Sequence, residues 1–229
     1  MRSPLILSLL VASVATTLSL VLGVAFACVF FLLGRRRLGS AWSAKVAEMG
    51  DALLSLPLVL PPTVLGYYLL TLLGRQSVLG RMFETVTGSP LTFTPTAAVV
   101  AAMVSALPAI ARSTRAALLE ADPLYFRAAA SLGASPVRAL WTVGIPICRR
   151  QIAAATMLAF ARALGDFGVT LMIAGNIPGY TQTASLAVYD AVQAGRERDA
   201  LALIIPLSLF ALFVLYGVGR LQEKGTSRK

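Results

Sequence analysis

The chain of 229 residues contains no histidine, only two cysteines and few charged side chains. Without histidine, most zinc sites and most acid–base chemistry near neutral pH lose their usual ligand or proton carrier. Charged residues make up 13% of the chain and hydrophobic residues 57%, whereas soluble domains average about 25% and 45–50%. This composition argues against a soluble enzyme, and we expect neither catalytic residues nor a metal site.

The charge that is present has one dominant sign, with 20 Lys and Arg against 10 Asp and Glu. A basic excess is typical of nucleic-acid binding when it forms a soluble face. Here the charges lie between long apolar runs, so we expect no nucleic-acid partner. Each cysteine lies in or beside such a run, and no structural disulfide is expected.

Five stretches are long and apolar enough to cross a membrane as helices. A helix needs about 20 mostly apolar residues to cross a hydrocarbon core of about 30 Å. We therefore predict an all-α integral membrane protein with five transmembrane helices and one domain over residues 1–229. The predicted spans cover about residues 5–33, 52–74, 90–111, 151–175 and 200–219.

The first stretch shares features with a secretory signal peptide, since Met1-Arg2 precede it and Ala25-Phe26-Ala27 resemble a cleavage site. Its uncharged run from Ser3 to Gly34 has 32 residues, whereas the apolar centre of a signal peptide has about 7–15. Three arginines follow at positions 35–37. We interpret the stretch as a retained span.

Basic residues are divided unevenly between the two sides of the predicted bundle. Cytoplasmic loops of membrane proteins are enriched in Lys and Arg. With the N-terminus outside, the inner segments hold 14 basic residues and the outer segments five. We predict an outer N-terminus and an inner C-terminus, with the basic tail at residues 224–229 beside anionic lipid headgroups.

The predicted cytoplasmic segment 112–150 is 39 residues long, whereas helix connections usually have about 2–8. Asp122-Pro123 favours the start of a helix, and Gly133 favours its end. Ser135-Pro136 predicts a second helical segment that ends at Pro146. Such short helices either lie on the membrane surface or dock on a cytoplasmic partner.

The same segment resembles the cytoplasmic loop motif of ABC importer permeases. Three residues separate Ala128-Ala129 from Gly133, and nine more lead to Val143-Gly144-Ile145-Pro146. The family motif reads Glu-Ala-Ala, three residues, Gly, nine residues, Ile-x-Leu-Pro, so that Arg127 stands in place of Glu. The resemblance implies coupling helices that seat in a groove of an ATP-hydrolysing subunit. The candidate coupling residues are Arg127, Ala128, Ala129, Leu132, Gly133 and Pro146.

Two further stretches narrow the resemblance. Leu56 to Tyr67 resembles the second-span signature of molybdate permeases. Ala159 to Gly168 resembles a segment shared by molybdate, tungstate and sulfate permeases, with Asp166 in place of Glu. Three motifs in the right order carry more weight than one. On these residues the chain is identified as a member of the molybdate/tungstate permeases of type I ABC importers.

This resemblance implies a multi-pass protein of the cytoplasmic membrane that imports molybdate as a homodimer. It implies two cytoplasmic ABC ATPase subunits, an extracytoplasmic molybdate-binding protein and membrane lipid as partners. ATP and Mg²⁺ would be bound by the ATPase subunits, and we expect no cofactor on this chain. The chain has no Gly-x-x-x-x-Gly-Lys-Ser/Thr pattern, so we do not expect it to be an enzyme.

Arg162 and Asp166 are charged residues within the fourth predicted span. A charge at the centre of a span costs about 2.5–3.5 kcal/mol on insertion scales, so both should face protein or water. Their spacing of four residues predicts that they can pair on one helix face. Two interpretations stay open. The pair is structural, which we favour, or Arg162 lines the translocation path and offsets the charge of an oxyanion. Arg162 and Asp166 are the candidate path or gate residues of this span.

Three prolines in the second predicted span, Pro57, Pro61 and Pro62, remove backbone donors and predict a kinked helix. Non-helical backbone at membrane depth is tolerated where it is buried or lines a watery cavity. Leu60 to Thr63 is therefore interpreted as a gate segment of the path or as a packing kink. Thr63 offers the one hydroxyl there that could meet an oxyanion.

Glycines at positions 66, 165 and 168 are small enough for close helix contact. We expect a second copy of the chain to supply the partner surface for them. On the outer side, Pro178-Gly179 predicts a turn. The candidate contacts to the binding protein there are Asn176, Pro178, Gly179 and Thr181, and a plain connector is the alternative.

Alternatives remain at the level of function. Within transport, the runner-up is a sulfate/thiosulfate or a tungstate permease, because the segment around Arg162 is shared. A different class is a stand-alone ion channel or membrane scaffold that needs no ATPase. The long inner loop argues against that class.

Overall fold

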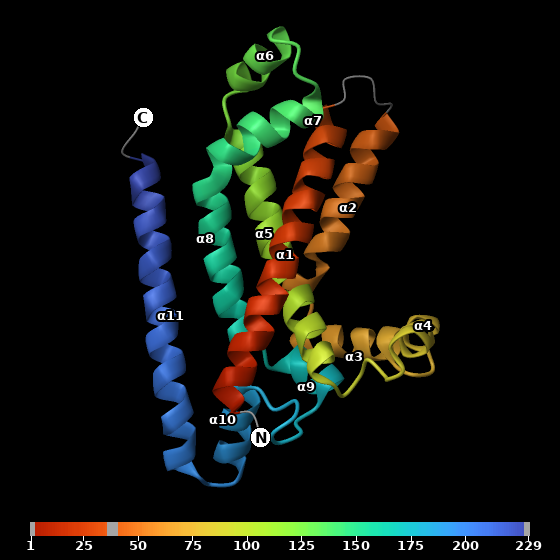
Figure 1. Cartoon of the computed structure of the whole chain (residues 1–229), viewed down its shortest axis with the longest axis vertical. Helices are drawn as coiled ribbons and strands as arrows, with labels where there is room; N and C mark the ends of the chain where they lie inside the picture. Colours follow the sequence, from red (N-terminus) through yellow and green to blue (C-terminus); the bar gives the residue numbers. More distant parts are fainter. Residues whose placement is uncertain (1–2, 36–40, 227–229) are drawn as a thin grey trace.

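The computed structural model describes residues 3–35 and 41–226, and these residues contain helices and no strand. Long helices run roughly along one axis of the molecule, and shorter helices lie at both ends (Figure 1). The long helices are α1 (Pro4–Arg35), α2 (Ala41–Val59), α5 (Pro95–Glu120), α8 (Ile145–Leu164) and α11 (Glu197–Thr226).

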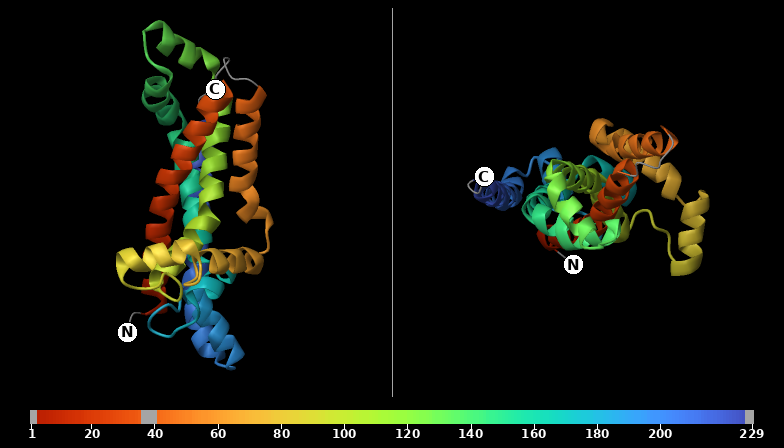
Figure 2. Two further views of the ribbon diagram at one scale, coloured as in Figure 1. Left: turned by 90° about the vertical axis from the view of Figure 1, so that its right-hand side faces the viewer. Right: turned by 90° about the horizontal axis from the view of Figure 1, so that it is seen from above.

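The two ends of the bundle differ in what they carry (Figures 1 and 2). One end holds α6 (Pro123–Ser131), α7 (Pro136–Ala139) and the C-terminus, and we call it the α6 end. The opposite end holds the N-terminus and four short helices, and we call it the α10 end. These are α3 (Pro62–Leu73), α4 (Val78–Thr87), α9 (Gly168–Ala174) and α10 (Ala184–Gln193).

Three of the described helices are long and apolar enough to cross a membrane by themselves, namely Pro4–Gly34, Pro95–Glu120 and Glu197–Leu221. The other two predicted spans are bent pairs of helices. Met49–Val59 and Pro62–Leu73 meet at 116°, and Pro136–Leu164 and Gly168–Ala174 meet at 57°. The structure is therefore consistent with three to five spans, depending on whether each pair counts as one.

Helix ends differ from the predicted limits where the sequence has no break. Helix α5 continues past Ala111 to Glu120, into the segment that the sequence analysis assigned to the inner loop. Its run of Ala, Leu and Arg residues favours helix, so nothing ends it before Ala121. The predicted lipid contact of the basic tail, residues 224–229, lies outside the described side chains.

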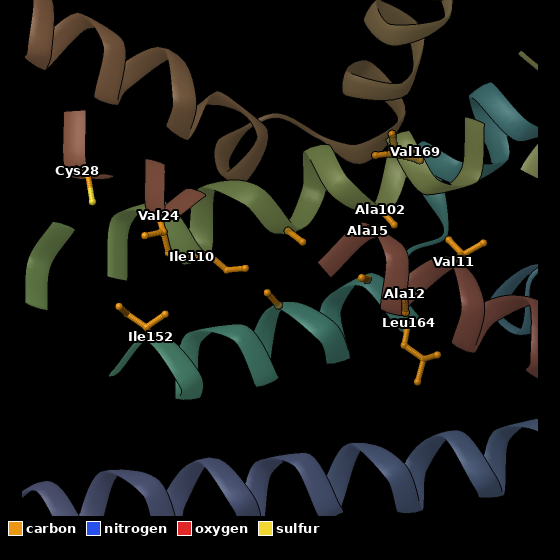
Figure 3. Packing of buried hydrophobic residues seen from close by; sticks show 14 of the residues in the cluster. Val11, Ala12, Ala15, Val24, Cys28, Ala102, Ile110, Ile152, Leu164 and Val169 are labelled. Atoms are coloured by element: carbon orange, nitrogen blue, oxygen red, sulfur yellow. The ribbon is translucent and has the colours of Figure 1, made fainter. Parts of the chain in front are cut away.

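The core lies where α1, α5 and α8 cross (Figure 3). Small residues occupy the crossing, because backbones in a membrane bundle associate by close packing rather than by exclusion of water. A Cβ added at Gly23 of α1 would lie 3.1 Å from the Ile110 side chain of α5, so the two helices leave no spare room. In α1, α5 and α8 the alanines of this core with no exposed surface are Ala12, Ala15, Ala98, Ala101, Ala102, Ala106 and Ala159.

Polar contacts tie the α1 helix to its neighbours. Ser19 Oγ donates to the Met103 carbonyl of α5 at 3.2 Å, and Ser8 Oγ accepts from the first N–H of α10 at 2.7 Å. Near the α6 end, Arg115 of α5 forms an ion pair with Asp51 of α2 at 2.8 Å. The long helices are therefore tied to one another along the core and near the α6 end, and α1 is also tied to the short helix α10 at the opposite end.

Candidate coupling and translocation sites

Helix α6 begins and ends where the sequence analysis predicts. Asp122 Oδ1 accepts a hydrogen bond from Leu124 N at 2.8 Å, which satisfies a backbone donor in the first turn. At the other end Gly133 has φ +80°, with Gly133 N bonded to Ala130 O and Ala134 N to Ala129 O, both at 3.0 Å. This pair of bonds is a Schellman motif, and its left-handed residue is the glycine of the predicted motif.

One aromatic side chain holds α6 on the bundle. Phe126 is buried, and its ring centroid lies 5.4 Å from that of Phe31 on α1. A Cβ added at Gly144 would lie 3.2 Å from the Phe126 ring and 3.1 Å from Leu118. The sequence analysis did not single out Phe126 or Gly144. The sequence feature that could have indicated this contact is the glycine of the Val143-Gly144-Ile145-Pro146 pattern.

Most other side chains of α6 face solvent. Leu124 is 59% exposed and Leu132, just beyond the helix, is 89% exposed. Arg127 and Ala128 are exposed as well, whereas Ala129 is half-buried. The structure thus brings the predicted coupling residues Arg127 to Gly133 together at the α6 end, on a helix that stands clear of the long helices (Figure 2).

The second helical segment does not end at Pro146, contrary to the sequence prediction. It passes from α7 through a π-helical turn, η1 (Leu140–Gly144), directly into α8. Ile145 N donates to Leu140 O, five residues back. Proline lacks a donor and clashes with the carbonyl four residues before it. The wide π turn gives room for that ring, and Pro146 lies in the first turn of α8 instead of ending a helix.

The predicted kink in the second span is present, and it is a sharp break. Helix α2 passes through Pro57 and ends at Val59, and α3 begins at Pro62. Pro61 has ψ 137°, because a residue that precedes proline is pushed out of the helical region. Pro61, Pro62 and Thr63 are exposed in the single chain.

For two of the three glycines, the surface that packs against them belongs to the same chain and not to a second copy. A Cβ added at Gly168 of α9 would lie 2.7 Å from Pro62 Cβ, and one added at Gly66 would lie 2.7 Å from Met172 Cβ. Both glycines therefore serve the packing of α3 against α9. The sequence analysis assigned this role to a second copy, because it could not foresee that α3 folds back against α9.

Asp166 joins three elements, and it does so without the predicted pairing to Arg162. Its Oδ1 accepts from Ser105 Oγ of α5 at 3.1 Å, and its Oδ2 accepts from Thr170 N at 3.0 Å and from the Thr170 hydroxyl. Helix α8 ends at Leu164, so Asp166 leaves the helical register in which residues four apart share a face. The carboxylate instead caps the first turn of α9, where negative charge is favourable.

Arg162 keeps an exposed side chain near the end of α8. Its Nε donates to the Ser105 carbonyl at 3.2 Å, so Arg162 and Asp166 both reach Ser105. Among the residues that the structure describes, no carboxylate forms an ion pair with this guanidinium. Its charge is therefore available to a partner or a ligand.

The loop after α9 contains the predicted turn. Tyr180 N bonds to Ile177 O at 3.1 Å across Pro178-Gly179, and Gly179 has φ +74°, as a type II turn requires. Thr181 is fully buried, and its hydroxyl donates to Gly175 O at 3.2 Å. Of the four candidate contacts to a binding protein, Thr181 is thus not a surface residue, while Pro178 is exposed.

Next to this loop lies a cavity of about 910 Å³ that the sequence analysis missed. It is open at the α10 end between α3, the start of α4 and the loop before α5. Arg75 is among its lining residues, but it is ion-paired to Glu84 at 2.8 Å. No local motif marks this cavity, because its walls come from three separate segments. The polar lining includes Arg75, Gln76, Ser77, Ser89, Thr92, Thr94 and Tyr180.

Comparison with known proteins places this architecture in a family. The profile described as "Binding-protein-dependent transport system inner membrane component" matches residues 19–226. The chain belongs to this family. The chain is a multi-pass membrane protein, as the sequence analysis predicts.

Individual relatives cover nearly the whole chain. The molybdenum transport system permease protein ModB of Escherichia coli K12 is 37% identical, over 97% of this chain and 95% of the relative. The putative molybdenum transport system permease protein YvgM of Bacillus subtilis is 34% identical, over 98% and 93%. A chain of the MetNI methionine ABC transporter, in inward-facing conformations, shares the fold with a TM-score of 0.72 at 18% identity, covering 98% of this chain and 99% of its own.

Proposed function

We propose that the chain is the transmembrane permease subunit of an ATP-driven importer that carries molybdate across the cytoplasmic membrane. The observation that carries this proposal is identity of 34–37% to molybdenum permeases over 97–98% of the chain. The exposed helix α6 with its Schellman glycine supports the coupling part of the proposal. The chain supplies the pathway, and separate subunits hydrolyse ATP.

The topology that we propose has five crossings, made by α1, the α2–α3 pair, α5, the α8–α9 pair and α11. Successive crossings run in alternate directions, so the N-terminus and the C-terminus lie at opposite ends (Figure 1). The α6 end faces the cytoplasm in this proposal, because cytoplasmic segments are enriched in basic residues. The described basic side chains at that end are Lys45, Arg112, Arg115, Arg127, Arg138, Arg149, Arg150 and Arg220. Those at the α10 end are Arg75, Arg81, Arg196 and Arg198.

Two copies of the chain form one pathway in this proposal, with two ATPase subunits at the α6 ends and a binding protein at the α10 ends. Binding of ATP changes the conformation of the ATPase pair, and α6 transmits this change to the bundle through Phe126 and Phe31. A partner shifts the bundle between inward and outward states only if it binds the two states unequally. Attachment of α6 to α1 through the Phe126–Phe31 contact makes such unequal contact possible.

Arg162 is the residue that we propose for the pathway. Its guanidinium is exposed in the single chain although an unpaired charge is costly at membrane depth. A water-filled path or the second copy must therefore face it. Replacement by alanine is expected to lower transport more than assembly of the complex, and replacement by lysine to retain part of the transport. Equal loss of assembly and transport would assign Arg162 a structural role.

The test of the whole proposal is substrate-stimulated ATPase activity. The chain is reconstituted in liposomes with the ATPase subunit and the binding protein from the same organism, and molybdate, tungstate and sulfate are compared. Stimulation by molybdate or tungstate but not by sulfate is expected. Stimulation by sulfate alone would keep the mechanism and change the substrate. Failure to assemble with any ATPase would refute the importer.

A further inference from the structure

The face of helix α6 opposite Phe126 is exposed, and Arg127 lies about midway along its length. Residues spaced by three and four share a helix face, so Leu124, Arg127, Ala128 and Ser131 form one strip. All four are exposed, and Leu132 continues the strip. We call these five residues the α6 docking face. Phe126 points the opposite way, into the bundle, and thereby fixes which side of α6 faces outward.

The composition of this face favours close contact with a protein. Leu124 and Leu132 supply apolar area, and the small side chains of Ala128 and Ser131 allow a partner to approach the backbone. The helix lies beyond the ends of α1 and α2 (Figure 1), which sets it apart from the bilayer that those helices cross in the proposed topology. A protein rather than the lipid surface is therefore the occupant that fits.

Arg127 is the charged group that such a partner must accommodate. No carboxylate forms an ion pair with it in the part of the chain that the structure describes. The nearest polar neighbour on the face, Ser131, already uses its hydroxyl to donate to the Arg127 carbonyl at 3.1 Å. Asp122 is engaged as the cap of α6. The guanidinium and its five N–H donors thus keep their hydrogen-bonding capacity for a partner.

Burial of this face would remove Arg127 from water. An unpaired charge in an interface is strongly unfavourable, whereas a carboxylate can accept two parallel hydrogen bonds from a guanidinium. We infer that the ATPase groove that receives α6 carries an acidic side chain opposite Arg127. This inference rests on the proposed function and adds the charge of the partner's contact residue to it.

The test measures binding of the purified ATPase subunit to the permease dimer in lipid nanodiscs, at two salt concentrations. The variants are Arg127→Gln and Arg127→Glu, with Arg198→Glu as the matched control, because Arg198 is an exposed arginine at the α10 end. We expect Arg127→Gln to weaken binding about tenfold and to reduce its salt dependence, since removal of one partner leaves the other charge unpaired in the interface. Arg127→Glu should weaken binding further, and Arg198→Glu should leave it unchanged.

A charge-reversal scan completes the test. Each acidic residue of the ATPase docking groove is replaced by lysine and paired with Arg127→Glu, and one of these pairs should restore binding. Wild-type affinity of Arg127→Glu, or absence of any restoring partner, would overturn the inference while leaving the importer intact. An effect of Arg127 seen only with anionic lipid in the nanodisc would also overturn it, by assigning the residue to headgroups. Failure of the wild-type chain to bind the ATPase would instead refute the proposed function.

Discussion

Replacement of Asp166 should destabilise the bundle, by a smaller amount for asparagine than for alanine. The carboxylate accepts three hydrogen bonds, one from Ser105 and two from Thr170, and both of these residues are buried. In Asp166→Asn the amide oxygen keeps the two bonds from Thr170, and the NH₂ group can donate to the Ser105 hydroxyl. The number of bonds is then retained but their charge assistance is lost. Hydrogen bonds to charged groups contribute about 1.5–3 kcal/mol against about 0.5–1.5 for neutral ones.

Three such differences, discounted because Asp166 is only half-buried, give a loss of about 2 kcal/mol for Asp166→Asn. Asp166→Ala removes all three bonds and should cost about 4 kcal/mol. For a chain of this length, 1 kcal/mol corresponds to a shift of about 2–4 °C in the unfolding midpoint. We therefore expect shifts of about 4–8 °C for asparagine and roughly twice that for alanine.

The chain carries its own probe for this measurement. Cys28 and Cys148 are free and buried, so a fluorogenic thiol reagent should label them only as the bundle unfolds. The matched control is Asp190→Asn, because Asp190 is ion-paired to Arg196 at 2.8 Å on an exposed surface. Exposed pairs contribute about 0–1 kcal/mol, so its midpoint should hardly move. Equal midpoints for the Asp166 and Asp190 variants would refute the assigned network.

Three further substitutions, two of them compared with a control glycine, test the packing and the coupling helix. Gly168→Ala should cost about 1–3 kcal/mol, because its new Cβ meets a rigid proline ring at 2.7 Å, whereas Gly165→Ala meets nothing closer than 3.6 Å. The thermal midpoint of each variant checks this difference. Gly133→Ala and Gly195→Ala should each cost about 1–2 kcal/mol, since both have positive φ and open surroundings, but only Gly133→Ala should lower stimulated ATPase activity. Phe126→Ala should leave ATPase binding measurable but reduce transport per ATP hydrolysed, which flux and phosphate release report together. Unchanged coupling would contradict the role of this ring as an anchor.

Local chemistry explains which structural predictions are confirmed. The start of α6 at Asp122-Pro123, its end at Gly133 and the turn at Pro178-Gly179 each depend on residues within a few positions of one another. Side-chain caps and positive φ are decided at that range. The kink at Pro61-Pro62 belongs to the same group, because proline restricts the residue before it.

The predictions that differ from the structure depend on distant partners or on unexpected local geometry. Asp166 bonds to Ser105, which lies 61 positions away in the sequence. The spacing of Arg162 and Asp166 indicates a pair only if the helix continues, and α8 ends between them. Pro146 ends no helix, because the π turn before it is not encoded in a simple pattern. Sequence periodicity shows neither which distant residue will lie nearby nor where the backbone will depart from a regular helix.

The division of roles between Arg162 and Asp166 follows from how each side chain is used. The Asp166 carboxylate accepts three hydrogen bonds, from Ser105 of α5 and Thr170 of α9, so its charge stabilises the contact between these two helices. Arg162 donates from Nε to the Ser105 carbonyl, which orients the guanidinium while the side chain as a whole remains exposed. A guanidinium that is held through one nitrogen is suited to bind a transported anion weakly, so that the anion is also released. Substitutions at the two positions should therefore separate, with Asp166 variants losing stability first and Arg162 variants losing transport first.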